Sequence, residues 1–508
     1  MEDSRTRKSA KNIFAAVILK IFEILLPFIS RTIIIKTLGI EYVGLSGLFS
    51  SIIGVLSLAE MGAGAALVYA MYEPIKEKNS EKICAIIGLY RKLYISIGLF
   101  VGMLGMLVVP FLDRLIKAGT YPNDINIQLL YIVYLVNTII TYLVFAYKTS
   151  LLDARQAGFK ASSVKIKMLL VQYCLKIGVL LYLKNYYAYI IVMPICTLIT
   201  CIWTGIVADR SYPDLKPKGR LPQKDTKEIV SKIKSLFLYK IGSVVLNSID
   251  SIVISWYFGA MVLGVYNNYY YIVSSLFSVL LAVGIAITPS VGNSMVSKTL
   301  DENYKDFMMF SAGYDWIIGW CFVCIVCLIQ PFIKLWIGID NQLPFGYAIL
   351  FGVYFICFRI GDVVGWYKDA AGLWEPDKYR PLISSVVNLT LNIILIQIIG
   401  LYGVLLSTIL SLATINYPIA VRVIIKHFRK PLWPYVKQQL FSILVISASL
   451  ICTLWMCSYM KSDNDLFNLI ISICICLVVP NIIMCICFIK NRNVKDFLGF
   501  VNTRFLKH

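Results

Sequence analysis

The sequence predicts an all-α polytopic membrane protein with two six-helix lobes, related as a parallel repeat, plus two C-terminal helices. Of its 508 residues, 59% are hydrophobic and 15% are charged, and the mean hydropathy is +0.76. Soluble globular chains are about 45–50% apolar and about 25% charged, so the composition excludes that class. Since one span needs about 20 apolar residues, the chain has room for about 14 transmembrane helices.

Hydropathy assigns spans one to six to the first lobe and spans seven to twelve to the second, with two spans following. The predicted spans lie near residues 13–35, 44–71, 93–110, 127–147, 166–183, 186–208, 236–258, 262–288, 308–330, 344–366, 380–399, 401–421, 437–459 and 466–489. We therefore expect an N-terminal lobe over 1–208, a basic cytoplasmic connector over 209–235 and a C-terminal lobe over 236–424. Spans thirteen and fourteen, with a cytoplasmic tail, occupy 425–508.

Basic residues predict the orientation of the spans. The two termini and the even-numbered loops carry 37 Lys and Arg residues, counting Lys167, Arg380 and Lys437 at the adjoining span ends, whereas the odd-numbered loops carry 6. The remaining five lie inside spans. Such a bias places both termini and the connector in the cytoplasm. It also explains the net charge of +20, so we expect no nucleic-acid partner. The first apolar run is long and lacks a small-residue cleavage site, so we expect no cleaved signal peptide.

An internal repeat relates the two lobes. Residues 20–67, shifted by 220 positions without gaps, give eleven identities in 48. The most informative matches are the glycines and the pair Lys20 and Lys240. Gly39 with Gly259 and Gly44 with Gly264 mark a turn after the first helix of each copy. Glycine suits such a turn because it tolerates positive φ. Six spans per copy is an even number, so the copies share one orientation, as in transporters with two parallel lobes.

Ten ionisable residues lie inside the predicted spans, where each costs about 2.5–3.5 kcal/mol at the membrane centre. They are Lys20, Glu23, Arg31, Glu60, Lys176, Lys240, Asp250, Asp315, Arg359 and Asp362. They must line a hydrated cavity, pair with one another or reach the interface. In the first span, Lys20, Glu23 and Arg31 fall on one helical face about 80° wide, which we expect to face protein or water.

Five of these residues are candidates for binding an anionic substrate group, since cations at membrane depth match phosphate oxygens. They are Arg31, Lys20, Lys176, Lys240 and Arg359. Three alternatives stay open: Lys20 pairs with Glu23, Arg359 pairs with Asp362, and Lys240 extends to the interface.

Two further groups are candidates for ion coupling and for sugar contact. The coupling candidates are the carboxylates Glu23, Glu60, Asp250, Asp315 and Asp362. The candidate sugar contacts are Tyr269, Tyr270, Asn388 and Asn392. Packing of the tyrosines and hydrogen bonding between helices by the asparagines are the structural alternatives.

Cysteine and histidine usage argues against a metal centre or an enzyme. The chain has two His and fourteen Cys, which argues against a His-based site or a catalytic triad. Cys321, Cys324 and Cys327 follow a metal-like spacing, but they lie in an apolar segment without a local fourth ligand. A thiol in a span behaves as a small apolar group. We expect no metal and no cofactor.

Several segments resemble the bacterial polysaccharide flippases of the Wzx type, in the multidrug/oligosaccharidyl-lipid/polysaccharide exporter superfamily. The similar segments are 26–49, 56–62, 72–74, 379–383, 388–392 and 400–404. The resemblance implies a flippase, not an enzyme, that moves undecaprenyl-pyrophosphate-linked oligosaccharide units outward across the bacterial inner membrane by alternating access. It implies a cationic cavity at Arg31. The sequence contains no GxxxxGK[ST] phosphate loop and no soluble ATPase domain, so we expect the driving force to be a Na⁺ or H⁺ gradient, the membrane potential or downstream polymerisation. The translocated units would serve the synthesis of capsule, O-antigen or exopolysaccharide. The expected partners are a polysaccharide polymerase and a chain-length regulator.

The rival hypothesis is a cation-coupled multidrug or solute exporter of the same superfamily. Such an exporter should present acidic, aromatic lobes, and the lysine-rich first lobe argues against it. An integral-membrane transferase would need a large polar external loop, and the predicted external loops are short.

Overall fold

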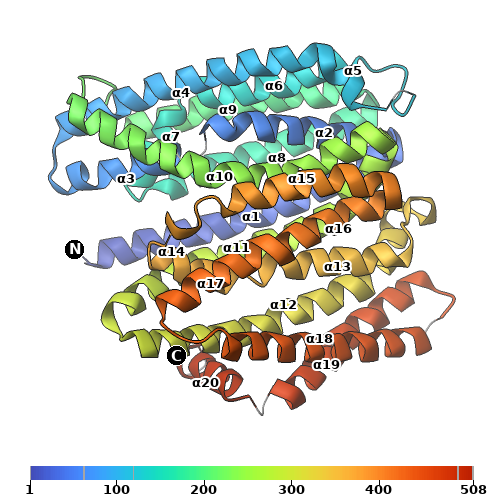
Figure 1. The fold of residues 1–508 in the computed structure, drawn as a ribbon. Coiled ribbons are helices and arrows are strands. Elements are labelled where there is room, and N and C mark those ends of the chain that lie inside the picture. Colours follow the sequence, from blue (N-terminus) through green and yellow to red (C-terminus); the bar gives the residue numbers. More distant parts are fainter. Residues whose placement is uncertain are drawn as a thin grey trace. The chain divides into compact units, whose positions relative to one another are not determined.

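The computed structural model describes residues 2–60, 63–117, 119–373, 375–460, 462–488 and 491–505. Within this part of the chain, nearly every residue is helical and no strand is present (Figure 1). The chain forms two compact units, Met1–Gly264 and Val265–His508. The all-α class predicted from hydropathy is confirmed.

The first unit contains ten α-helices and the beginning of an eleventh. Its elements are α1 (Glu2–Thr37), α2 (Glu41–Leu56), a 3₁₀ turn η1 (Ser57–Glu60), α3 (Ala63–Lys76), α4 (Ser80–Val108), η2 (Val109–Phe111), α5 (Leu112–Leu115), α6 (Ile127–Leu143), α7 (Ala146–Ala154), α8 (Gly158–Tyr182), α9 (Tyr186–Ser211) and α10 (Gln223–Phe258). Asn79, Asn126 and Asn185 cap α4, α6 and α9, because each side chain accepts a backbone N–H of the first turn.

The second unit begins within α11 and ends with a helix that hydropathy did not predict. Its elements are α11 (Ala260–Ser297), α12 (Leu300–Ile337), η3 (Ile339–Asn341), α13 (Phe345–Arg359), α14 (Asp362–Ala370), η4 (Glu375–Asp377), α15 (Arg380–Ile399), α16 (Leu401–Ser411), a π-helical turn η5 (Leu412–Asn416), α17 (Tyr417–His427), α18 (Trp433–Tyr459), α19 (Asp465–Phe488) and α20 (Arg492–Phe505). The predicted tail thus contains α20, an amphipathic helix that packs on α12.

Among the described residues, nine helices are long and apolar enough to cross a membrane, or ten if the bent pair α6–α7 is one span. The remaining predicted spans coincide with α1, α2 to α3, α8 and α10. The chain is therefore a multi-pass membrane protein, and the count of fourteen stays a prediction. So do the predicted domain limits, although α10 packs on α2 and falls into the first unit.

Several predicted spans are interrupted for local reasons. The second span breaks at η1, between α2 and α3. The fourth bends by 50° between α6 and α7, where Phe145 has a φ of 58° in the left-handed region. The twelfth contains the π-helical turn η5, which is followed by Pro418. Proline removes a backbone donor, so the ladder of helical hydrogen bonds cannot run regularly through this point.

The repeated glycines have two distinct roles. Gly39 and Gly259 have φ of +126° and +90°, as the turn requires. Gly44 and Gly264 instead lie where two backbones meet: a Cβ at Gly44 would overlap the carbonyl oxygen of Ala260, and one at Gly264 would overlap that of Ile40. The expectation of a turn role for this second pair was wrong.

This contact is reciprocal, since positions 40 and 44 meet positions 260 and 264, which are their counterparts 220 residues later. A reciprocal contact between equivalent segments is the signature of a two-fold relation. The starts of α2 and α11 are therefore related by a local two-fold axis, as the parallel repeat predicts.

Each unit has its own apolar core. In the first, α6 packs between α4 and α9, and Phe49 of α2 meets the ring of Tyr131 edge-on. In the second, α12 packs against α18 and α19 (Figure 1). Trp320 of α12 fixes that contact by donating a 2.9 Å hydrogen bond to the carbonyl oxygen of Cys476. Each core is built from side chains of several helices, and these contacts hold the helices of that unit together.

Candidate functional site

A basic face lies where α1 packs against α8 in the first unit. Lys20 and Lys165 both approach Glu23, with N–O distances of 3.5 and 2.7 Å. One carboxylate thus faces two ammonium groups, so this point of the face carries net positive charge. Nearer the amino ends, the Asn12 side chain accepts the backbone N–H of Phe159. From the Asn12–Phe159 contact to the Glu23–Lys165 contact, the residue numbers rise on both helices, so α1 and α8 run parallel.

Two further cations lie about three helical turns along the same helices. Arg31 follows Lys20 by eleven residues on α1, and Lys176 follows Lys165 by eleven residues on α8. Eleven residues return a helix to nearly the same face about 16 Å further on. We call Lys20, Arg31, Lys165 and Lys176 the basic face. Its cations form two levels, one around Glu23 and one around Tyr189 of α9.

Lys176 is buried, with 5% of its surface exposed. Its Nζ atom lies 4.7 Å from the ring centre of Tyr189 and 5.5 Å from that of Tyr173. Within the described part of the chain, no carboxylate forms an ion pair with it. A cation–π contact contributes about 2 kcal/mol when desolvated, whereas burying an ammonium costs several kcal/mol. The desolvation cost of burying the Lys176 ammonium group therefore exceeds the stabilisation from its described contacts.

Tyrosine hydroxyls surround the second level. The hydroxyl groups of Ser30 and Tyr189 are 2.9 Å apart, and Tyr189 stacks on Tyr186. Arg31 is half-buried and interacts electrostatically with Tyr134 and Tyr189. Hydroxyls can donate to an oxyanion as well as accept from a guanidinium. The level therefore combines two cations with neutral hydrogen-bond donors.

A second feature of the first unit is the carboxylate at the helix break. Glu60, at the end of η1, accepts a 3.1 Å hydrogen bond from the hydroxyl of Tyr94. Tyr94 stacks on Tyr90, whose hydroxyl donates to the carbonyl oxygen of Gly64 across the break. The tyrosine pair thus joins both sides of the interruption and holds the carboxylate there.

In the second unit, Arg359 and Asp362 form an ion pair of 3.3 Å. The hydroxyl of Tyr314 donates a 2.5 Å hydrogen bond to the same carboxylate, and the guanidinium lies 4.6 Å from the ring centre of Phe277. These contacts engage both charges inside the unit, which agrees with the pairing that their spacing of three residues predicts.

Other predicted site residues in this unit serve helix packing. Asp315 of α12 accepts hydrogen bonds from Gln439 and Ser442 of α18, each of 2.9 Å. Asn388 of α15 is fully buried and donates to the hydroxyl of Thr408 on α16 at 2.8 Å. Asn392 is buried one turn further along. These contacts favour the structural alternative for the asparagines.

The predicted aromatic contacts lie in a similar setting. Tyr269 is fully buried; its hydroxyl donates to Gln330 at 3.1 Å and accepts the backbone N–H of Leu343 at 3.0 Å. Tyr270 is half-buried and stacks on Tyr266. The contacts of Tyr269 tie α11 to the end of α12 and to the segment before α13.

Two predicted residues remain on α10. Asp250 is buried within the first unit. The side chain of Lys240 lies outside the part of the structure that is described, so its expected role stays a prediction.

Sequence reasoning missed Lys165 and the tyrosines around Arg31. A usable signal existed for Lys165, because its spacing of eleven residues to Lys176 repeats the spacing of Lys20 to Arg31. No comparable signal exists for Tyr134 or Tyr189, which approach Arg31 only through tertiary packing.

The family comparison matches residues 9–295 to a family described as "Polysaccharide biosynthesis protein". No curated protein matches the chain in sequence. Among solved structures, the fold is similar to that of the lipid II flippase MurJ in an inward closed conformation, with a TM-score of 0.66, 15% identity, and coverage of 94% of this chain and 98% of that one.

Two transporters of the MOP superfamily are also similar in fold. One is a multidrug resistance MATE family transporter in an inward-facing conformation, with a TM-score of 0.59, 15% identity, and coverage of 86% and 98%. The other is a Pyrococcus furiosus transporter whose binding pocket is described as having reverse polarity, with a TM-score of 0.51, 14% identity, and coverage of 86% and 95%. At these identities the likeness concerns the fold alone. Because the family match covers more than half of the sequence, the chain belongs to the polysaccharide biosynthesis protein family, which confirms the membership predicted from its motifs.

Proposed function

We propose that this protein is a flippase that moves undecaprenyl-pyrophosphate-linked oligosaccharide units from the inner to the outer leaflet of the bacterial cytoplasmic membrane. The single observation that carries the proposal is the basic face on α1 and α8. Around Glu23 two ammonium groups share one carboxylate, and Lys176 is buried against aromatic rings. A diphosphate supplies negative charge to this face, and guanidinium and ammonium groups match its oxygens.

The two levels of the basic face suggest how the headgroup travels. They lie about 16 Å apart along the membrane direction of both helices. The diphosphate passes from the Glu23 level to the Tyr189 level while the lipid tail stays in the bilayer. Alternating access between the two repeats then exposes the sugars on the outer side, with both termini in the cytoplasm.

An ion gradient is the proposed driving force. Of the five predicted coupling carboxylates, Glu60 has the most suitable setting, because it lies at a helix break and its described partner is a neutral tyrosine. By contrast, Glu23, Asp315 and Asp362 are engaged by lysines, by α18 side chains or by Arg359. Replacing Glu60 by Gln should remove the dependence of transport on a Na⁺ or H⁺ gradient.

Translocation of a fluorescent undecaprenyl-pyrophosphate oligosaccharide in liposomes tests the proposal. Wild type should expose the label to a membrane-impermeant quencher or enzyme, and Arg31→Ala and Lys176→Met should each reduce the rate at least tenfold. Lys167→Met is the matched control, since Lys167 lies on α8 two residues from Lys165 and its Nζ is 5.6 Å from the ring of Trp203.

Two results would overturn the proposal. The first is unchanged translocation by properly folded Arg31→Ala and Lys176→Met. The second is gradient-driven efflux of cationic dyes without any lipid translocation, which would establish the multidrug exporter instead.

A further inference from the structure

Three thiols from three helices meet in the second unit. Cys327 of α12, Cys457 of α18 and Cys476 of α19 have sulfur atoms that all lie within 4.8 Å of one another. Cys324 lies one turn before Cys327 on α12 and is outside this group of three sulfurs. Spacing along α12 could not reveal this group, because the other two sulfurs come from helices more than 120 residues away.

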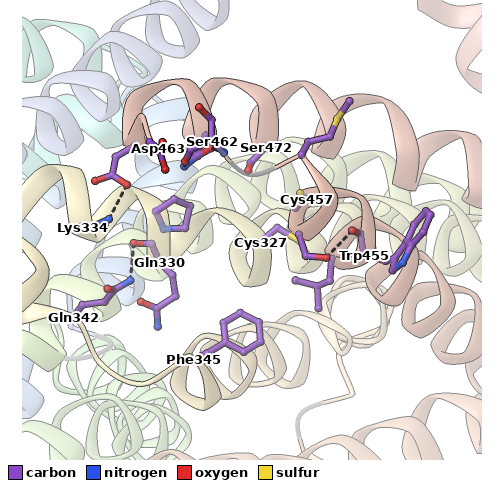
Figure 2. A pocket seen from close by; sticks show the side chains of 16 residues that line it. Cys327, Gln330, Lys334, Gln342, Phe345, Trp455, Cys457, Ser462, Asp463 and Ser472 are labelled. Atoms are coloured by element: carbon purple, nitrogen blue, oxygen red, sulfur yellow. Dashed lines mark hydrogen bonds and ion pairs between the residues drawn. The ribbon is translucent and has the colours of Figure 1, made fainter.

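Two members of the thiol cluster formed by Cys327, Cys457 and Cys476 line a pocket of about 830 Å³, namely Cys327 and Cys457. Figure 2 shows Cys327 and Cys457 on its wall, opposite polar residues of α12 and of the loop between α18 and α19. At its rim, Lys334 forms a 2.7 Å ion pair with Asp465. On the predicted orientation, that loop is external, so a hydrated ion reaches the sulfurs from outside through a polar opening.

We propose that Cys327, Cys457 and Cys476 bind one soft, thiophilic metal ion, with monovalent copper as its natural occupant. Sulfur ligands select Cu(I), Zn²⁺ and iron–sulfur clusters. Structural Zn²⁺ takes four ligands in a tetrahedron, and iron–sulfur clusters are held by four cysteines. Three converging sulfurs match the three-coordinate geometry that Cu(I) accepts.

Cysteine coordinates a metal ion as the thiolate, so each sulfur that binds releases one proton to the pocket. The cluster adjoins an apolar core that includes Val323, Ile446 and Met484. Charge does not select Cu⁺ over a divalent ion at this site; the number of converging sulfurs does.

The bound ion would join α12 to the two C-terminal helices. Because a ligand that binds only the folded state stabilises it, metal should raise the unfolding temperature of the protein. This inference does not rest on the flippase proposal, since none of the three cysteines belongs to the basic face.

The test uses full-length protein in detergent, reduced and kept without oxygen. Three exposed cysteines, Cys174, Cys452 and Cys474, are first replaced by alanine so that they cannot bind metal. Cu(I) is supplied from bicinchoninate, and Ag⁺ serves as a probe that is not oxidised. This background should retain one ion per chain after desalting and show a higher unfolding temperature with metal than without.

In that background, Cys457→Ala and Cys476→Ala should each weaken metal binding about 100-fold and abolish the thermal shift. Cys321→Ala is the matched control, since Cys321 lies on α12 outside the cluster. Gel filtration and metal-free unfolding temperatures establish that every variant is folded. If a loss of folding follows Cys476→Ala, Cys457→Ala alone decides the question.

Three outcomes would overturn the proposal. One is no retained ion in the background protein, and another is the same affinity in the folded cluster variants. The third is a thiol titration that finds two fewer free thiols before reduction, with no metal uptake after it, because the cluster would then be a disulfide pair and a spare thiol.

Discussion

The two units differ in how charged side chains at membrane depth are paired. In the first unit, Lys20 and Lys165 share the single carboxylate of Glu23, and Lys176 is buried against tyrosines. In the second, Arg359 pairs with Asp362, and in the loop between spans ten and eleven Lys368 and Arg380 both contact Asp377 at 2.5 and 2.7 Å. The cluster of Lys368, Asp377 and Arg380 also contacts the π-helical turn η5, since Arg380 donates a hydrogen bond to the side chain of Asn416.

This difference separates charges that stabilise the fold from charges that are available for function. A buried pair with good hydrogen bonds offsets much of its desolvation cost, and removing one partner is strongly destabilising. A buried cation without a carboxylate lowers stability, so its presence indicates selection for binding. We therefore expect substitutions in the two units to separate stability from transport.

The largest effect on stability should follow Asp377→Ala. This change removes the carboxylate that both Lys368 and Arg380 contact and leaves two cations close together at a buried site. We expect a loss of about 3–5 kcal/mol in the free energy of unfolding, measured by chemical denaturation in detergent. Glu375→Ala, which removes an exposed ion pair with Lys378, is the control and should cost less than about 1 kcal/mol.

Arg359→Met should show an intermediate effect that a second change reverses. The single variant leaves Asp362 without its ion-pair partner and should cost about 2 kcal/mol. The double variant Arg359→Met/Asp362→Asn should recover most of that loss, because it removes both charges together. Equal destabilisation by the single and double variants would contradict a structural role for the pair.

Lys176→Met should change stability little, or increase it, while transport falls. Methionine is unbranched and nearly as long as lysine, and it removes a buried charge whose desolvation cost exceeds the stabilisation from its cation–π contact. We expect an unfolding free energy equal to or above that of wild type, together with a loss of translocation of at least tenfold in liposomes. A large destabilisation would place Lys176 with the structural charges of the second unit.

The smallest effect should come from the capping box at the start of α12. Thr299 and Glu302 satisfy each other's backbone donors there, outside the apolar part of the helix. Thr299→Ala should cost about 1 kcal/mol and leave the translocation rate unchanged. A transport defect in this variant would link the start of α12 to the transport cycle.

The sequence by itself determined most of the helices and the positions of their charges. Long apolar segments become helices because backbone groups in lipid must be satisfied within the segment, so the predicted spans coincide with observed helices. Gly39 and Gly259 were predictable for a similar reason, since a positive φ is a local property of the backbone. The stripe of Lys20 and Arg31 follows directly from helical periodicity.

Only the tertiary structure decided which side chains meet. Hydropathy measures the composition of a segment and not the partners of its side chains. It therefore could not predict that Tyr189 contacts Lys176, that Asp377 contacts Lys368, or that three cysteine sulfurs from distant segments meet. Nor could it detect the bend at Phe145, whose left-handed backbone is imposed by packing on a residue that does not favour it. The partner of a side chain depends on contacts between helices that are far apart in the sequence, and the composition of a single span does not specify those contacts.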